Sequence, residues 1–135
     1  DSKYKDKVLE CITLNEIARL LIDEFDDELF FFREKRAVDV LRGYCKLKGN
    51  AINDYMSCHF ATEFPDENDE EHFGNNGVAF YLDNPAVDES CIVVLTYNEF
   101  FCVVERRYEG YIKENSEKKE EVLFLLNELK NSLEL

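Results

Sequence analysis

The amino-acid sequence predicts an α+β fold, in which a small antiparallel sheet of about three strands is flanked by N-terminal helices and a C-terminal helical hairpin. Three observations lead to this prediction. Apolar residues recur at helical spacing near both ends of the chain, short runs rich in β-branched and aromatic residues occupy the middle, and the connections between these runs are short. A length of 135 residues suits one compact domain spanning residues 1–135.

Two helices are predicted in the N-terminal third. The sequence Thr13-Leu14-Asn15-Glu16 has the form of a capping box, in which the threonine and glutamate side chains each bind the other residue's backbone N–H. The apolar residues around it keep helical spacing and predict a helix over about 14–24: Leu14, Ile17, Ala18, Leu21 and Phe25. A further stripe predicts a helix over 34–48, which Gly49-Asn50 would end.

Three strands are predicted in the middle of the chain, over 55–63, 77–83 and 91–96. Each is short, rich in β-branched or aromatic residues and close to asparagine, glycine or proline. Because the connection between the last two cannot hold a crossover helix, we expect them to pair as an antiparallel hairpin. We expect the sheet to pack against the helices near 14–24 and 97–115.

The C-terminal part predicts a helical hairpin. A second capping box, Thr96-Tyr97-Asn98-Glu99, opens one helix, and Ser116 is expected to cap the other. Their apolar stripes contain Phe100, Phe101, Val104, Tyr108, Tyr111 and Ile112, then Val122, Leu125, Leu126, Leu129 and Leu133. The facing stripes predict that Phe100, Val104, Tyr108, Leu125 and Leu129 pack together.

Negative charge dominates the composition, since 30 acidic residues outnumber 16 lysines and arginines and give a formal net charge of −14. Much of the excess lies in two acidic segments, 23–28 and 63–71. A field of this sign attracts a basic partner and repels nucleic acid. The alternative is that these segments are solvated faces that serve solubility alone.

The acidic side chains are the candidate partner-binding residues, and the loop 65–76 is the first candidate among them. Aromatic residues border both segments, and protein interfaces commonly combine aromatic anchors with a polar rim. The candidate set is Asp23, Glu24, Asp26, Asp27, Glu28, Asp66, Glu67, Asp69, Glu70 and Glu71.

Motifs for catalysis, metals or phosphate are missing from the sequence. Cys58 and His59 are neighbours on a predicted strand, so their side chains point to opposite faces and form no dyad. An EF-hand loop starting at Asp66 would need glycine and glutamate where Glu71 and Gly77 stand. We expect no catalytic residue, no metal site and no cofactor.

Nucleic-acid and membrane binding are disfavoured. Acidic residues interrupt or flank the basic pairs, as with Arg106-Arg107 between Glu105 and Glu109, so no uncompensated basic face is expected. No apolar run approaches the length of a membrane span. The five cysteines form no C-x-x-C pair and have apolar neighbours, which predicts buried reduced thiols and a cytoplasmic location.

The C-terminal two-thirds, over about 54–134, resembles a known family. The resemblance rests on the strand Ile92–Leu95 running into Thr96-Tyr97-Asn98-Glu99-Phe100, and on the closing segment Lys118-Lys119-Glu120-Glu121-Val122 with Leu125-Leu126. In these features the chain is similar to immunity proteins of contact-dependent growth inhibition (CDI) systems, specifically the ribonuclease toxin immunity group.

The resemblance implies a protein that binds the C-terminal toxin domain of a large secreted effector and catalyses nothing. The toxin would cleave RNA and be cationic, and an acidic surface would cover its RNA-binding or active site. Two other classes remain open from the residues alone. One is an acidic adaptor or nucleic-acid mimic that regulates a basic host protein, and the other is a small hydrolase or metal-dependent enzyme.

Overall fold

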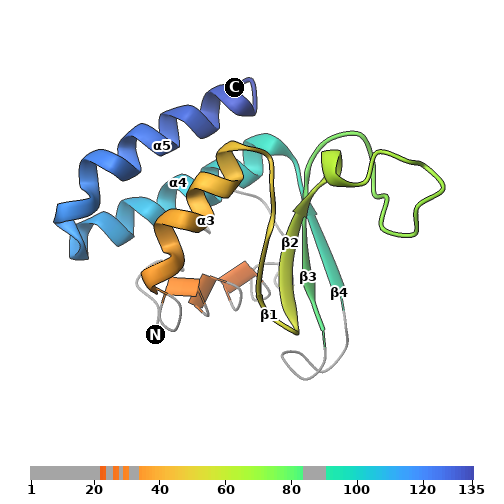
Figure 1. The fold of residues 1–135 in the computed structure, drawn as a ribbon, viewed down its shortest axis with the longest axis horizontal. Coiled ribbons are helices and arrows are strands. Elements are labelled where there is room, and N and C mark those ends of the chain that lie inside the picture. Colours follow the sequence, from red (N-terminus) through yellow and green to blue (C-terminus); the bar gives the residue numbers. More distant parts are fainter. Residues whose placement is uncertain (1–21, 24–25, 28, 31–33, 84–90) are drawn as a thin grey trace.

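The computed structural model describes residues 22, 23, 26, 27, 29, 30, 34–83 and 91–135 (Figure 1). Most of the predicted helix over 14–24, its capping box at Thr13 and the connection 84–90 lie outside these residues. The described part mixes helices with an antiparallel sheet, which confirms the α+β class. Its elements are the 3₁₀ turn η2 (Glu34–Arg36), α3 (Ala37–Cys45), β1 (Asn50–Asn53), β2 (Met56–Phe60), the 3₁₀ turn η3 (Ala61–Glu63), β3 (Val78–Leu82), β4 (Cys91–Leu95), α4 (Tyr97–Glu114), the 3₁₀ turn η4 (Ser116–Lys118) and α5 (Lys119–Ser132).

The described sheet has four strands in the order β1-β2-β3-β4, one more than the expected three or so. The additional strand, β1, forms an irregular hairpin with β2, in which the register shifts between Ala51 and Asn53. The Asn53 side chain stabilises the turn by accepting a hydrogen bond from the Tyr55 backbone N–H at 2.8 Å. The sequence of β1, Asn-Ala-Ile-Asn, is too short and too polar to show the alternation of apolar and polar residues by which a strand is predicted.

Strands β2, β3 and β4 pair in a regular antiparallel register, which divides their side chains between two faces. Phe80 lies opposite both Cys58 and Val93, and all three are buried on the inner face. Strand β2 ends at Phe60, earlier than the predicted residue 63, because Ala61–Glu63 turn away as a 3₁₀ helix. The outer face carries the alternate residues of each strand.

Helix α4 begins at the predicted capping box. The Thr96 N–H donates to Glu99 Oε1 at 2.9 Å, and the Glu99 N–H donates to Thr96 Oγ1 at 3.1 Å. The prediction for Ser116 is wrong, since residues 116–118 form a separate 3₁₀ turn and α5 starts after Lys118 without a side-chain cap.

Helix α3 ends at Cys45, before the expected residue 48, because Leu47 adopts a positive φ of 56°.

The helices lie on one side of the sheet, and the loop that follows η3 lies on the other (Figure 1). Helix α5 packs on α3 and α4. The five residues predicted to pack in the core are all buried in one apolar cluster. Within it, the Phe100 ring contacts Tyr44 of α3 at a centroid distance of 5.1 Å and Phe60 of β2 at 5.3 Å, which joins the helices to the inner face of the sheet.

Candidate functional site

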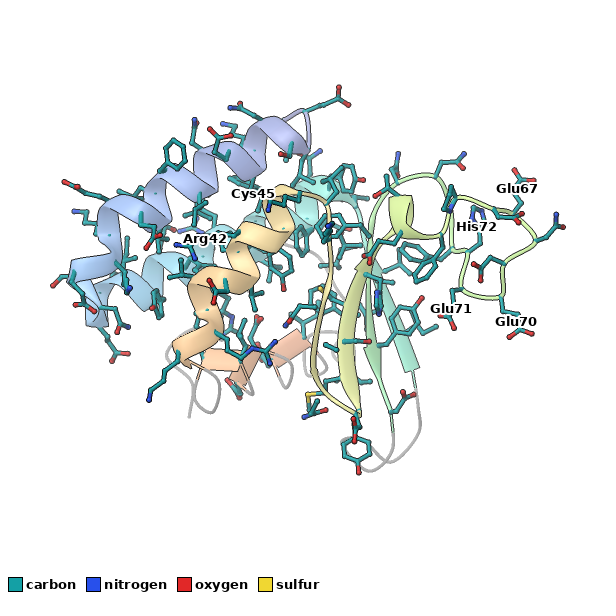
Figure 2. The ribbon with its side chains drawn as sticks, in the orientation of Figure 1. Arg42, Cys45, Glu67, Glu70, Glu71 and His72 are labelled. Atoms are coloured by element: carbon teal, nitrogen blue, oxygen red, sulfur yellow. The ribbon has the colours of Figure 1, made fainter. Side chains whose placement is uncertain are left out.

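Five of the predicted site residues lie together and exposed on the loop between η3 and β3, which we call the acidic loop (residues 64–77). They are Asp66, Glu67, Asp69, Glu70 and Glu71. Figure 2 shows Glu67, Glu70 and Glu71 projecting from the loop, far from the helices. The placement follows from hydration, because a carboxylate without a partner is costly to bury.

Two successive turns shape the acidic loop. Asp66 accepts the Asn68 N–H on its side chain at 2.9 Å, and Asp69 accepts the Glu71 N–H at 2.9 Å. The backbone carbonyls of the same two aspartates accept from Asp69 and His72, each at 3.0 Å. Aspartate side chains commonly bind backbone N–H groups two residues on, so the acidic sequence itself encodes these turns.

Both ends of the acidic loop are fixed to the sheet. At its start, Glu63 Oε2 accepts the backbone N–H groups of Phe60 at 2.6 Å and Gly49 at 3.0 Å. At its end, Gly77 has a φ of +106°, and a Cβ there would lie 2.9 Å from the carbonyl oxygen of Leu95. The Gly77 carbonyl also accepts the Ala61 N–H at 3.0 Å. The exposed charges therefore keep a defined position relative to the strands.

Aromatic contacts join the acidic loop to the outer face of the sheet. The His59 ring lies 5.5 Å from Phe64 and 5.3 Å from Tyr81, measured between centroids. Partial burial and the nearby Glu71 carboxylate raise the pKa of Tyr81. Further along, Nδ1 of His72 lies 2.8 Å from the Phe64 carbonyl oxygen. Since that oxygen can only accept, Nδ1 carries the proton.

In the first acidic segment, residues 23–28, two of the aspartates are buried, whereas exposed charge was expected. Asp23 and Asp26 are buried and form ion pairs with Arg107, which is itself 1% exposed. Arg107 Nη2 lies 2.5 Å from Asp23 Oδ1, and its Nε lies 2.9 Å from Asp26 Oδ2. The expectation of exposed charge is therefore wrong for these two aspartates. Asp27 is half-buried, and Glu24 and Glu28 lie outside the described residues.

The buried ion pairs leave Asp26 with an unusual affinity for protons. Burial raises the pKa of Asp26 to about 7, against the opposing attraction of Arg107, and the neighbouring charges of Asp23 and Asp27 raise it further. Two carboxylates facing one guanidinium cannot both be neutralised by it, and burial makes the excess charge costly. These residues therefore belong to the folded core.

Arg107 is a residue that sequence reasoning missed, because it was assigned to a surface pair flanked by acids. One signal was present: Arg107 lies three residues after Val104 and four before Tyr111, within the apolar stripe of α4. A charged residue inside such a stripe is buried only when partners neutralise it. Those partners lie far from Arg107 in the sequence: Asp23 precedes it by 84 residues.

No catalytic arrangement is found among the described residues. Cys58 faces the core beside Tyr44, with burial raising the pKa of its thiol to about 12, whereas His59 lies on the outer face. No group of three His, Cys, Asp or Glu side chains in the described part of the chain could hold a metal ion. None of the described helices is long and apolar enough to cross a membrane.

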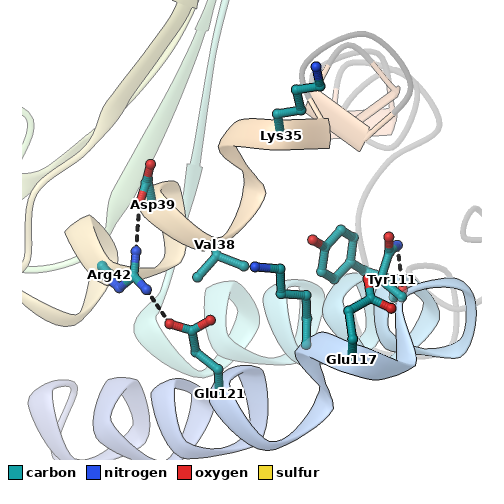
Figure 3. Close-up of a pocket in the computed structure, with 9 residues that line it drawn as sticks. Lys35, Val38, Asp39, Arg42, Tyr111, Glu117 and Glu121 are labelled. Carbon is teal, nitrogen blue, oxygen red and sulfur yellow. Dashed lines mark hydrogen bonds and ion pairs between the residues drawn. The ribbon is translucent and has the colours of Figure 1, made fainter.

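A surface hollow of about 520 Å³ lies where α3, α4 and η4 meet (Figure 3). Its wall mixes both charges. Arg42 bonds to Asp39 at 2.5 Å and also to Glu121 of α5, so its charge is compensated within the protein. His59 and the cysteines are not among the residues that line it. The hollow therefore contains none of the histidine and cysteine side chains that the sequence offered as a catalytic pair, and Arg42 binds two of its carboxylates.

Comparison with known protein families shows to which family the chain belongs. The sequence profile of a family described as CDI immunity protein matches residues 19–126. The chain belongs to the CDI immunity protein family. The match confirms the resemblance to CDI immunity proteins, without the ribonuclease subgroup, and extends it to the N-terminal segment that contains Asp23 and Asp26. Membership indicates that the chain neutralises a cognate CDI toxin, and immunity proteins are typically not enzymes. Neither a curated protein nor a solved structure matches the chain.

Proposed function

We propose that this CDI immunity protein binds and neutralises a cationic ribonuclease toxin domain through the acidic loop. The observation that carries the proposal is the set of five exposed carboxylates on a loop whose two ends are fixed to the sheet. A toxin that cleaves RNA needs a cationic groove to bind the phosphate backbone. A fixed cluster of negative charge is complementary to such a groove.

The chain acts as a stoichiometric inhibitor in the cytoplasm of the cell that makes it, and it catalyses no reaction. The acidic loop attracts the toxin over a distance and raises the rate of association, which is the property that electrostatic complementarity changes most. Once bound, the loop masks the RNA-binding or active site. Asp23 and Asp26 contribute indirectly, because their ion pairs with Arg107 hold the N-terminal segment against α4.

Neutralisation can be measured with the C-terminal toxin domain of the cognate CDI effector. Cells that express the toxin domain alone are expected to stop growing, and co-expression of the full chain is expected to restore growth. In vitro, one equivalent of the chain should abolish RNA cleavage by the purified toxin domain. Cleavage of RNA that continues at full rate in the presence of excess chain would contradict the proposal, and so would a toxin that degrades no RNA.

A further inference from the structure

Two aliphatic side chains are exposed on strand β4, at the edge of the described sheet. Ile92 is 57% exposed and Val94 is 50% exposed, although both lie in the continuous apolar run Cys91–Leu95. Their neighbours Val93 and Leu95 point to the inner face and are buried. Edge strands of soluble proteins usually carry charged residues or other features that prevent association. An apolar edge therefore needs an explanation.

The strand register places these side chains beside the acidic loop. Ile92 lies opposite Tyr81, and Val94 lies opposite Ala79, which in turn lies opposite His59. Besides partial burial, the Glu71 carboxylate of the acidic loop lies near enough to Tyr81 to raise the pKa of its hydroxyl, and the His59 ring contacts both Tyr81 and Phe64. We call Tyr81, Ile92 and Val94 the outer patch. The outer patch therefore lies on the face of the sheet away from the buried core, and the acidic loop lies on the side of the sheet away from the described helices (Figure 1).

Charge is distributed unevenly along the chain, and the outer patch lies in its most negative part. No lysine or arginine occurs between Lys48 and Arg106, a stretch that contains the whole described sheet and the acidic loop. The acidic residues of that stretch are Asp54, Glu63, Asp66, Glu67, Asp69, Glu70, Glu71, Asp83, Asp88, Glu89, Glu99 and Glu105. All the lysines and arginines lie before or after it. The described sheet and the acidic loop therefore carry acidic side chains and no lysine or arginine, which favours a basic partner surface.

We propose that the outer patch is the apolar centre of the toxin interface and that the acidic loop is its charged rim. The inference rests on the proposed function and names the surface through which it operates. Its occupant is a basic protein surface that presents apolar side chains between its lysines and arginines. Interfaces of this kind bury an apolar centre that holds the partners together, surrounded by charges that guide their encounter.

The arrangement predicts a division of kinetic roles. The outer patch lies at the contact itself and is uncharged, so removing its aliphatic groups should speed dissociation and leave association nearly unchanged. The acidic loop acts at a distance through its field, so its neutralisation should slow association. The two surfaces can therefore be separated by rate measurements.

The test uses the full chain and a catalytically inactivated form of the toxin domain. The double variant Ile92→Thr/Val94→Thr keeps the branched shape that strands favour and removes apolar surface. We expect it to dissociate about tenfold faster or more, with an association rate within about twofold of the unmodified chain. The matched control is Leu123→Ala/Phe124→Ala on α5, where two exposed apolar side chains lie away from the sheet, and it should not change either rate.

A second measurement needs no variant and applies even if the double variant does not fold. Hydrogen exchange of the backbone N–H groups over 91–95 should be slower in the complex than in the free chain, and those over 119–132 should be unchanged. Unchanged exchange over 91–95, or a dissociation rate that rises only in the α5 variant, would overturn the inference. If the chain still blocks RNA cleavage in that case, the proposed function stands; if the unmodified chain does not bind the toxin at all, the proposed function fails first.

Discussion

At the scale of single residues, Arg107 joins the N-terminal segment to the middle of α4 through its ion pairs with Asp23 and Asp26. The Arg107→Leu variant would leave the two aspartates buried without their counterion. We expect a loss of about 3–5 kcal/mol in the free energy of unfolding, measured by urea denaturation. Adding Asp23→Asn and Asp26→Asn to that variant should recover part of the loss. A loss below about 1 kcal/mol for Arg107→Leu would show that the ion pairs do not stabilise the fold.

Asp26 should make stability depend on pH. Its folded pKa of about 7 is above the ordinary value of 3.8, so the folded state binds a proton that the unfolded state has lost. The proton on Asp26 therefore stabilises the folded state fully below about pH 4, and this stabilisation is lost as the pH rises through about 7. Its size is about 1.4 kcal/mol in the free energy of unfolding for each unit of pKa difference. Asp26→Asn removes this titration.

The measurement is the free energy of unfolding of the unmodified chain minus that of Asp26→Asn, followed from pH 4 to pH 8. The difference should become steadily less favourable to the unmodified chain as the pH rises. Asp23, Asp27, Arg107 and Tyr108 surround the group and are the same in both proteins, so they largely cancel. A difference that grows in favour of the unmodified chain would mean that Arg107 outweighs burial.

At the scale of elements, Gly77 fixes the end of the acidic loop against β4. Gly77→Ala forces a side chain into a φ of +106° and places its Cβ 2.9 Å from the Leu95 carbonyl oxygen. We expect a loss of about 1–3 kcal/mol in the free energy of unfolding. The control is Gly43→Ala in α3, where a Cβ meets only the Lys48 carbonyl oxygen at 3.6 Å, and which should be neutral or stabilising. Equal stabilities for both variants would contradict the role of Gly77.

The elements also show which structure a sequence pattern can reveal. Helix α4 was predictable because a capping box and a four-turn apolar stripe agree on it. Strand β1 could not be predicted, because four residues with a polar residue at each end show no alternation of apolar and polar side chains. The exposure of Ile92 and Val94 could not be predicted either, because a continuous apolar strand predicts burial on both faces, whereas the described helices cover only one face.

At the scale of the whole molecule, the sequence predicts the exposure of one acidic segment but not the burial of the other, and the reason is physical. Carboxylates without partners stay in water, so the exposure of Asp66–Glu71 follows from their sequence alone. The burial of Asp23 and Asp26 depends on Arg107, a partner that only the folded chain brings near them. The acidic residues therefore have two roles: Asp23 and Asp26 form ion pairs with Arg107 inside the core, and the acids of the acidic loop stay exposed to water.

The acidic loop is proposed to attract a cationic toxin to the sheet side of the molecule. The direct measurement compares association rates of the toxin domain with two five-fold variants of the chain. The first neutralises the acidic loop by Asp66→Asn, Glu67→Gln, Asp69→Asn, Glu70→Gln and Glu71→Gln, in which asparagine can still form the loop turns. The second neutralises the same number of exposed acids on the helical side by changing Glu109, Glu117, Glu120, Glu128 and Glu134 to Gln.

Both variants remove the same net charge, so they differ only in where the charge was. Near 0.01 M salt, where the Debye length is about 30 Å, the loop variant should associate about tenfold more slowly than the unmodified chain, and the helix variant should be much less affected. Near 1 M salt, where the length is about 3 Å, the three rates should converge. Equal slowing of both variants at low salt, or no slowing of the loop variant, would show that the acidic loop does not guide the association.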